Sequence, residues 1–204
     1  MEIEEFRKHA HDIVDWMADY MATVGERPVR AQTKPGEVAD RLPLAPPAGP
    51  EPMSAILNDF ERDVLPGVTH WQHPRFFAYF PANSSPPSVL AEMLTATLGA
   101  QCMLWQTSPA GTEIETLMMD WLRQGLGLSE GFQGVIQDSA SSATLAAVLV
   151  MRERALEWKG NKQGLSGQQR VRIYASDEVH TSVDRAIWVA GVGAENLVRR
   201  QRAD

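Results

Sequence analysis

The sequence has very little cysteine and no long apolar run, and both shortages narrow what the protein can be. Cys102 is the only cysteine in the sequence, which excludes an internal disulfide framework and fits a reducing compartment. The longest apolar run, residues 145–151, is far too short to cross a bilayer. The opening residues, MEIEEF, lack the basic and apolar regions of a signal peptide. We therefore expect a soluble, cytoplasmic protein.

Positive charge is also scarce. The sequence has 19 lysine and arginine residues against 26 aspartate and glutamate residues, which gives a net charge of -7. Nucleic-acid-binding proteins normally carry a basic stripe, so this composition argues against that class. Any recognition of a phosphate group has to come from local hydrogen-bond donors. With 44% hydrophobic and 22% charged residues, the chain has the composition of an ordinary globular protein.

The first part of the chain predicts two helices joined by an extended connector. Apolar residues recur at steps of three or four over residues 3–24, which is typical of a long amphipathic helix. The proline-rich residues 41–52 predict an extended connector, and residues 53–65 predict a second helix. The apolar face of the first helix consists of Ile3, Phe6, Ala10, Ile13, Met17, Tyr20 and Val24.

Aromatic residues are concentrated in the segment 69–85, THWQHPRFFAYFPANSS, which has no helical period. Such a segment is either an aromatic loop that fills a core or a loop that lines a pocket for a flat, apolar ligand. Two further helices follow. Residues 86–104 predict one, and Ser108 and Pro109 form a typical N-cap and first-turn pair for the other.

From residue 132 the pattern changes to alternating strands and helices. Strands are predicted at 132–137, 171–176 and 196–200, and helices at 139–158 and 178–190. This order is typical of a parallel sheet with crossover helices. The sequence therefore predicts an α/β fold class, with a helical arm and aromatic loop over 1–85 and the first part of an α/β domain over 86–204.

Three serines lie in the turn between the first predicted strand and its helix: Ser139, Ser141 and Ser142. One serine suffices for an N-cap, so the turn is either a generously capped helix or a binding site for a phosphate group. The polar segment 176–182, SDEVHTS, follows the second strand at the same edge of the sheet. Ligands of parallel sheets bind at this edge, which favours the phosphate site.

Four stretches, taken together, resemble a known family: HPRFFAYFPANSSPPSVLAEML, WQTSPAGTEIETLMMDWL, GVIQDSASSATL and SDEVHTSVDRA. In this order they resemble the group II amino-acid decarboxylases that depend on pyridoxal phosphate, and the aromatic-L-amino-acid decarboxylases in particular. The resemblance covers most of residues 1–200. It implies the fold of the aspartate-aminotransferase-like enzymes (fold type I), of which this chain contains the first part.

The resemblance also implies roles for individual residues. It assigns Ser139, Ala140 and Ser141 to the cofactor phosphate, and His180 to catalysis and to stacking on the pyridine ring. It implies a homodimer in which the N-terminal arm embraces the partner. The substrate pocket implied by the resemblance is lined by Trp71, Tyr79, Phe80, Pro81, Ala82, Asn83, Gln101 and Met103.

The sequence departs from the family pattern at some positions. Asp138 stands where many relatives have glycine, and Ala82 stands where animal members have threonine. The family also implies a lysine that forms a Schiff base with the cofactor and an aspartate that pairs with its pyridinium nitrogen. None of the lysines stands in a matching context, so the chain is expected to be an N-terminal half without activity of its own; these lysines are Lys8, Lys34, Lys159 and Lys162.

Three functions stay open at this point. The first is decarboxylation of an aromatic amino acid to its amine and carbon dioxide. The second is an inactive, truncated dimerisation module. The third is another pyridoxal enzyme of the same fold, such as an aromatic aldehyde synthase or an acidic amino-acid decarboxylase. No metal is expected, because the pair His70 and His73 has no cysteine or carboxylate partner at ligand spacing.

Overall fold

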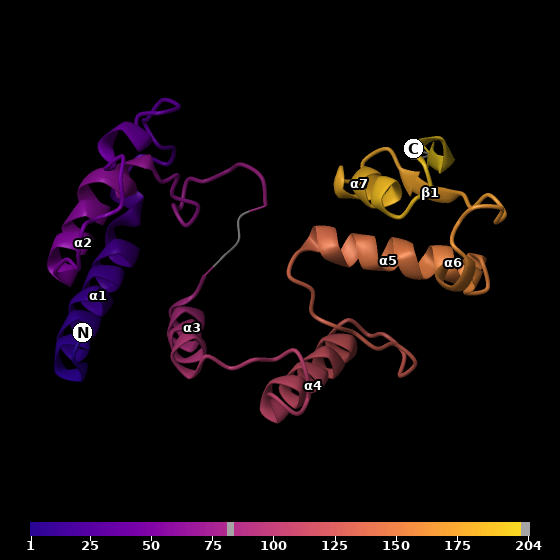
Figure 1. The fold of residues 1–204 in the computed structure, drawn as a ribbon, viewed down its shortest axis with the longest axis horizontal. Coiled ribbons are helices and arrows are strands. Elements are labelled where there is room, and N and C mark those ends of the chain that lie inside the picture. Colours follow the sequence, from indigo (N-terminus) through magenta and orange to yellow (C-terminus); the bar gives the residue numbers. More distant parts are fainter. Residues whose placement is uncertain (81–83, 201–204) are drawn as a thin grey trace. The chain divides into compact units, whose positions relative to one another are not determined.

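The computed structural model describes residues 1–80 and 84–200, which form two compact units that divide between Gly99 and Ala100 (Figure 1). The first unit is helical. Its helices are α1 (Ile3–Thr23), α2 (Met53–Asp59) and α3 (Pro86–Leu98). The predicted helices over 3–24 and 53–65 are confirmed, although the second continues as a π-helical turn over Phe60–Val64.

The second half of α1 packs within its own unit. The Trp16 ring meets Phe60 edge to face, with ring centroids 5.4 Å apart, and its indole N–H donates a hydrogen bond to Glu61. At the other end of the helix Ile3 and Phe6 stay 67% and 53% exposed. The apolar face predicted from the sequence is therefore only partly covered inside the unit.

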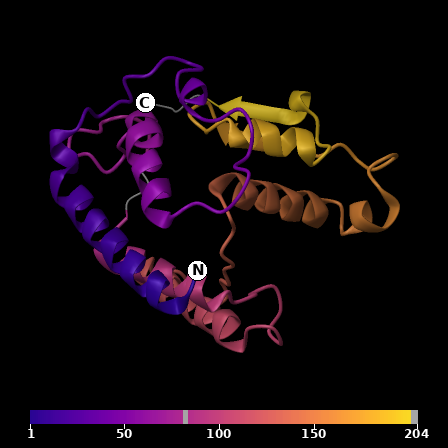
Figure 2. The same cartoon turned by 60° about the vertical axis from the view of Figure 1, so that its left-hand side comes forward.

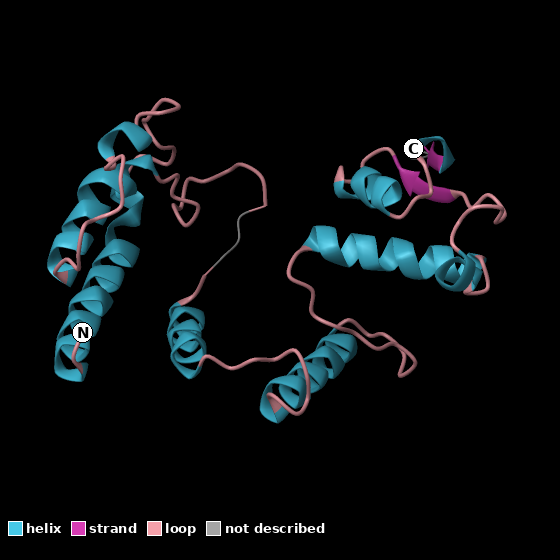
Figure 3. Cartoon of the chain, viewed as in Figure 1, coloured by secondary structure: helices cyan, strands magenta, loops and turns pink. Residues whose placement is uncertain are grey.

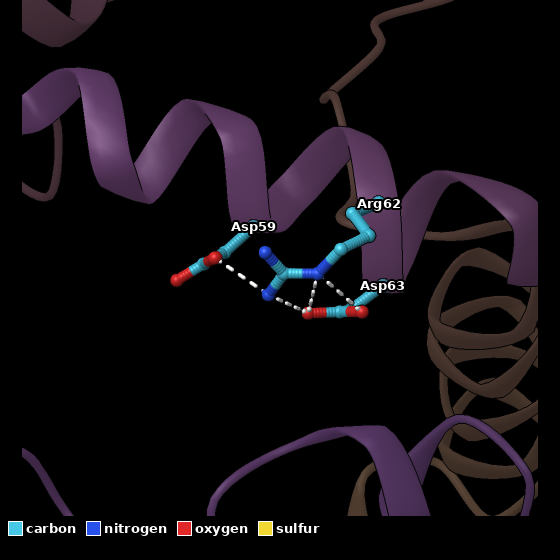
Figure 4. A network of polar contacts seen from close by, with 3 residues as sticks. All are labelled: Asp59, Arg62 and Asp63. Atoms are coloured by element: carbon cyan, nitrogen blue, oxygen red, sulfur yellow. Dashed lines mark hydrogen bonds and ion pairs between the residues drawn. The ribbon is translucent and has the colours of Figure 1, made fainter.

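A three-residue ion network lies at the end of α2 (Figure 4). The Arg62 guanidinium donates to Asp59 at 2.7 Å and to both carboxylate oxygens of Asp63, at 3.0 and 3.1 Å from Nε. The hydrogen bonds from Arg62 lower the pKa of Asp63, although desolvation acts in the opposite direction. The same contacts raise the pKa of Arg62.

The second unit is the α/β part of the chain. Two parallel strands, β1 (Ile173–Ser176) and β2 (Leu197–Arg200), pair in the register Ile173 with Leu197 and Ser176 with Arg200. The structure confirms the α/β fold class and the predicted strands over 171–176 and 196–200. The elements are α4 (Pro109–Gly125), α5 (Ala140–Ala155), α6 (Lys159–Gln163), β1 (Ile173–Ser176), α7 (Ser182–Val189) and β2 (Leu197–Arg200).

The core of this unit lies where α5, α7 and the strands meet. Ile187 of α7 is fully buried, and Val148 of α5 is almost so. This packing fixes the starts of α5 and α7 relative to the strands. The residues of the core are Val148, Ala186, Ile187 and Ala190, with Leu145, Leu149, Ile173, Val183, Val192 and Leu197 packed around them.

One prediction for this unit was wrong, and one short helix was not predicted. Residues 132–137 are a loop in place of a strand (Figure 3). A strand needs a ladder partner, and within residues 1–80 and 84–200 β1 and β2 pair only with each other, while the backbone N–H of Ile136 donates to the Glu115 carboxylate. The polar segment after α5 contains a short helix, α6, because the buried carboxylate of Glu153 accepts a hydrogen bond from the Asn161 N–H at 2.9 Å.

Candidate functional site

The serine turn forms the start of α5. Ser139 is the N-cap, and its hydroxyl accepts a hydrogen bond from the Ser142 N–H at 3.2 Å. The hydroxyl groups of these two serines lie 3.0 Å apart and are hydrogen-bonded. Two of the three serines are therefore engaged in capping the helix. Asp138 precedes the cap and does not provide it.

Three hydrogen-bond donors remain open at this turn. Within the part of the chain that the structure describes, the N–H groups of Ala140 and Ser141 and the Ser141 hydroxyl have no hydrogen-bond partner. Both residues are exposed. The start of a 16-residue helix also carries a partial positive charge. Open N–H donors beside a free hydroxyl are the donor set that a phosphate group requires, so these residues fit that ligand.

His180 lies in the loop between β1 and α7. Its ring is held by the backbone, because the Ser182 N–H donates to Nδ1 at 3.1 Å. An accepting Nδ1 carries no proton, so the ring proton of the neutral imidazole sits on Nε2. The residue is exposed, so a planar ring can stack on it. The predicted helix over 178–190 begins only at Ser182, and His180 precedes it.

An ion pair between α7 and β2 fixes the loop that carries His180. Arg199 binds both carboxylate oxygens of Asp184, at 2.7 and 2.9 Å. The other end of its guanidinium donates to the carbonyl of Asp177 at 3.4 Å. One arginine side chain therefore connects the loop, the helix and the neighbouring strand.

The serine turn and the His180 loop belong to the same side of the unit. Strand β2 points toward the side on which α5 begins (Figure 2), and β1 runs parallel to β2. The loop that follows β1 leaves from this side. A cavity of about 630 Å³ in this unit includes neither the serine turn nor His180. It is lined by Thr116, Met119, Asp120, Arg123, Glu130, Phe132, Gln133 and Gly134.

The aromatic segment of the first unit is an irregular loop with exposed rings. Trp71 stacks on Phe76 and on Tyr79, with centroids 4.8 and 5.8 Å apart. Tyr79 and Phe80 are 85% and 98% exposed. The alternative of a loop that fills a core is thus wrong for these two residues. The structure brings Trp71 and Tyr79 together, and Phe80 makes no ring contact among the described residues.

The other predicted pocket residues lie elsewhere in the chain. Gln101 and Met103 belong to the second unit and are exposed. The carbonyl of Gln101 accepts a hydrogen bond from the Thr107 hydroxyl at 2.7 Å, which shapes the turn before α4. Pro81, Ala82 and Asn83 lie outside the described residues.

Two histidines before the exposed rings have a role that the sequence did not show. His70 and His73 are buried, and the first accepts or donates a hydrogen bond with the Tyr20 hydroxyl at 2.7 Å. Burial, with the charges of Arg27 and His73, lowers the pKa of His70. In the sequence these residues were considered only as metal ligands. No group of three metal-binding side chains occurs among the residues that the structure describes.

Residues 35–203 match the family described as the pyridoxal-dependent decarboxylase conserved domain. Phenylacetaldehyde synthase from Arabidopsis thaliana is 40% identical over 202 residues, which is 96% of this chain and 40% of that protein. The chain belongs to the pyridoxal-dependent decarboxylase family, as the sequence indicated. It spans about two fifths of the length of the curated relatives that it matches.

Solved structures give the same result for the fold. The tryptophan decarboxylase of Catharanthus roseus, crystallised with L-tryptophan, superposes with a TM-score of 0.88 at 40% identity, covering 98% of this chain and 42% of that one. The Oryza sativa TDC structure with PLP and tryptamine gives a TM-score of 0.91 at 31% identity, covering 100% and 43%. The chain thus has the first part of the fold type I architecture, and the cofactor of its family is pyridoxal phosphate.

No helix in the described part of the chain is both long enough and apolar enough to cross a membrane. The comparisons give the family and its cofactor, and the structure gives exposed hydrogen-bond donors at the start of α5.

Proposed function

We propose that the protein decarboxylates an aromatic L-amino acid with pyridoxal phosphate and releases the amine and carbon dioxide. The observation that carries this proposal is the start of α5, where Ala140 and Ser141 present open donors in a chain that belongs to a pyridoxal-dependent family. Relatives named tryptophan decarboxylase and aromatic-L-amino-acid decarboxylase, 38% and 39% identical, support the aromatic substrate class.

We assign roles in cofactor binding to four residues. Ala140 and Ser141 bind the phosphate with two N–H groups and one hydroxyl, while Ser139 shapes the turn by capping α5. His180 stacks on the pyridine ring, and its hydrogen bond from the Ser182 N–H fixes the plane of the imidazole. When bound, pyridoxal phosphate supplies an electron sink for the electron pair released as the carboxylate leaves.

We assign recognition of the substrate side chain to the aromatic loop, residues 71–80. Trp71, Tyr79 and Phe80 offer exposed ring faces to an aromatic side chain, and stacked rings attract each other beyond their apolar contact. From the resemblance to the family, we also assign Pro81, Ala82, Asn83, Gln101 and Met103 to the substrate pocket.

Two finer proposals concern assembly and completeness. We propose a cytoplasmic homodimer in which the exposed end of α1 packs on the partner subunit. We also propose that residues 1–204 by themselves are inactive, because none of their four lysines stands in the context of the Schiff-base lysine. Lys159, for example, is paired with Glu157 at 2.7 Å.

The test is a substrate panel. The protein expressed from its complete reading frame, and a polypeptide of residues 1–204, are each incubated with pyridoxal phosphate and one amino acid. The acids are L-tryptophan, L-tyrosine, L-phenylalanine, L-dihydroxyphenylalanine, L-glutamate and L-aspartate. We expect an amine from at least one aromatic acid with the complete protein only. Turnover of the acidic substrates alone would refute the proposal. Turnover by residues 1–204 would refute the proposal that this part of the chain lacks the Schiff-base lysine.

A second candidate is an aromatic aldehyde synthase. It is favoured by two relatives named phenylacetaldehyde synthase, from Arabidopsis thaliana and Petunia hybrida, each 40% identical to this chain. The same panel separates the two functions, because an aldehyde synthase yields the aldehyde in place of the amine.

A further inference from the structure

The aromatic loop (residues 71–80) is attached to the end of α1 by two buried histidines. His70 is 5% exposed and stands directly before the loop, and His73 is 3% exposed and stands inside it. The rings of Phe77, Tyr79 and Phe80, which follow them, are exposed. Buried imidazoles beside exposed aromatic rings need a physical reason, since burial of a polar ring is unfavourable unless its nitrogens are hydrogen-bonded.

His70 connects the loop to α1 through Tyr20. Its Nδ1 lies 2.7 Å from the Tyr20 hydroxyl, and the two ring centroids are 5.6 Å apart. Its backbone N–H donates to the carbonyl of Val29 at 2.9 Å. Tyr20 is in turn stacked on Trp16 and covered by the Arg27 guanidinium, 5.4 Å from the ring centroid. The residue before the loop is therefore held from two sides.

His73 makes the second connection. Its Nε2 donates to the carbonyl of Gly25 at 3.1 Å, and its Nδ1 accepts the Arg75 N–H at 2.9 Å. These two hydrogen bonds define a single neutral tautomer and use both ring nitrogens. The neighbouring Pro74 lies beside Gly25, where an added Cβ would come within 3.4 Å of the proline ring, an ordinary contact distance.

We propose that His70 and His73 are positioning residues that hold the aromatic loop against the end of α1 and so set how well the protein binds an aromatic side chain. This proposal rests on the proposed function for its substrate. The two histidines act through Trp71 and Tyr79, which stack on one another 5.8 Å apart. A loop released from α1 would keep its aromatic residues but lose their fixed arrangement, and substrate binding would weaken while the chemical step stays intact.

The experiment uses variants that remove one hydrogen bond at a time in the complete protein. Tyr20→Phe removes the partner of His70 and keeps the ring. His73→Ala removes both contacts of His73, whereas His73→Gln keeps a donor for Gly25. Tyr174→Phe is the matched control, because Tyr174 is exposed on β1. Each protein is measured for KM and kcat with its best aromatic substrate and for amide hydrogen exchange over residues 71–80.

We expect Tyr20→Phe and His73→Ala to raise KM and the exchange rate of the loop about tenfold, since Tyr20→Phe leaves the buried His70 ring without its partner and His73→Ala removes both side-chain hydrogen bonds of His73. The value of kcat stays within about twofold, His73→Gln recovers most of the loss, and the control resembles the wild type. Unchanged exchange in both Tyr20→Phe and His73→Ala would overturn the proposal, as would a fall in kcat at constant KM.

The exchange measurement does not depend on turnover. If the complete protein decarboxylates no aromatic amino acid, the proposed function fails, while faster exchange in Tyr20→Phe still supports attachment of the loop. If turnover is normal and exchange in the variants equals that of the wild type, only the positioning role fails.

Discussion

Ser139 caps α5 by accepting the Ser142 N–H at 3.2 Å, and its hydroxyl is also hydrogen-bonded to the Ser142 hydroxyl at 3.0 Å. The capping role uses the first and third serines, and the hydroxyl of the second, Ser141, stays without a partner in the described part of the chain. The surplus serine is therefore available for a ligand. A turn built only to cap a helix would need no such group.

Ser141→Ala should weaken the affinity for pyridoxal phosphate roughly tenfold to a hundredfold. The variant loses one hydrogen bond to a charged group, which contributes about 1.5–3 kcal/mol. Ser142→Ala is the control, since it removes a hydroxyl one residue further on that binds Ser139. Titration of the cofactor-free protein measures both. Equal affinities in the wild type and Ser141→Ala would show that the phosphate binds elsewhere.

The exposed end of α1 should be the part of the arm that forms the dimer. Ile3→Asp combined with Phe6→Asp places two charges on an apolar surface that is open in the isolated unit, so the unit should fold while the dimer weakens. Lys8→Asp changes the charge on the opposite face and is the control. Sedimentation velocity at low micromolar concentration distinguishes dimer from monomer. A double variant that stays dimeric contradicts this role of α1.

Glu153→Ala should lower the free energy of unfolding by about 3 kcal/mol. Glu153 is 3% exposed, binds Arg152 at 2.8 Å and caps α6 through Asn161, so its removal leaves a largely buried guanidinium without its carboxylate. Arg154→Ala on the exposed side of α5 is the control. Chemical denaturation gives both values, and a loss below about 1 kcal/mol would mean that the pair contributes little.

Stability should fall at acid pH through Asp63. Its pKa is lowered in the folded protein by the hydrogen bonds from Arg62, so its contribution is complete above the unfolded value of about 3.9 and is lost as the pH falls through the folded value. Asp63→Asn should flatten the fall in melting temperature below about pH 4. Parallel slopes in the variant and the wild type would exclude this carboxyl as a source of the acid sensitivity.

The sequence predicted those elements whose signals are local. The helix after Ser108 is an example: the Ser108 hydroxyl accepts the Gly111 N–H at 3.2 Å, as an N-cap before proline does. The apolar residues 132–137 predicted a strand, but pairing depends on a neighbour that local pattern does not specify. Helix α6 escaped prediction because Asn161 is capped by Glu153, a residue eight positions away.

In the candidate site, too, local sequence does not predict contacts between residues that are far apart in the chain. The resemblance to the family supplied Ser139, Ala140, Ser141 and His180, and the local helix start explained why a phosphate fits there. The contact between Tyr20 and His70 spans 50 residues and brings together a helix end and a loop, which no periodicity can show. Sequence thus indicated the chemistry, and the structure added what holds the loop in place.

The most direct test of the central claim is the release of labelled carbon dioxide from carboxyl-labelled L-tryptophan and L-tyrosine by the complete protein. The measurement is made on the purified protein, after removal of its cofactor, and after pyridoxal phosphate is added back. The account predicts release that disappears with the cofactor and returns when it is restored, with one equivalent of amine for each carbon dioxide. Release that persists without the cofactor, or no release from these two substrates together with no turnover of L-phenylalanine and L-dihydroxyphenylalanine, would contradict it.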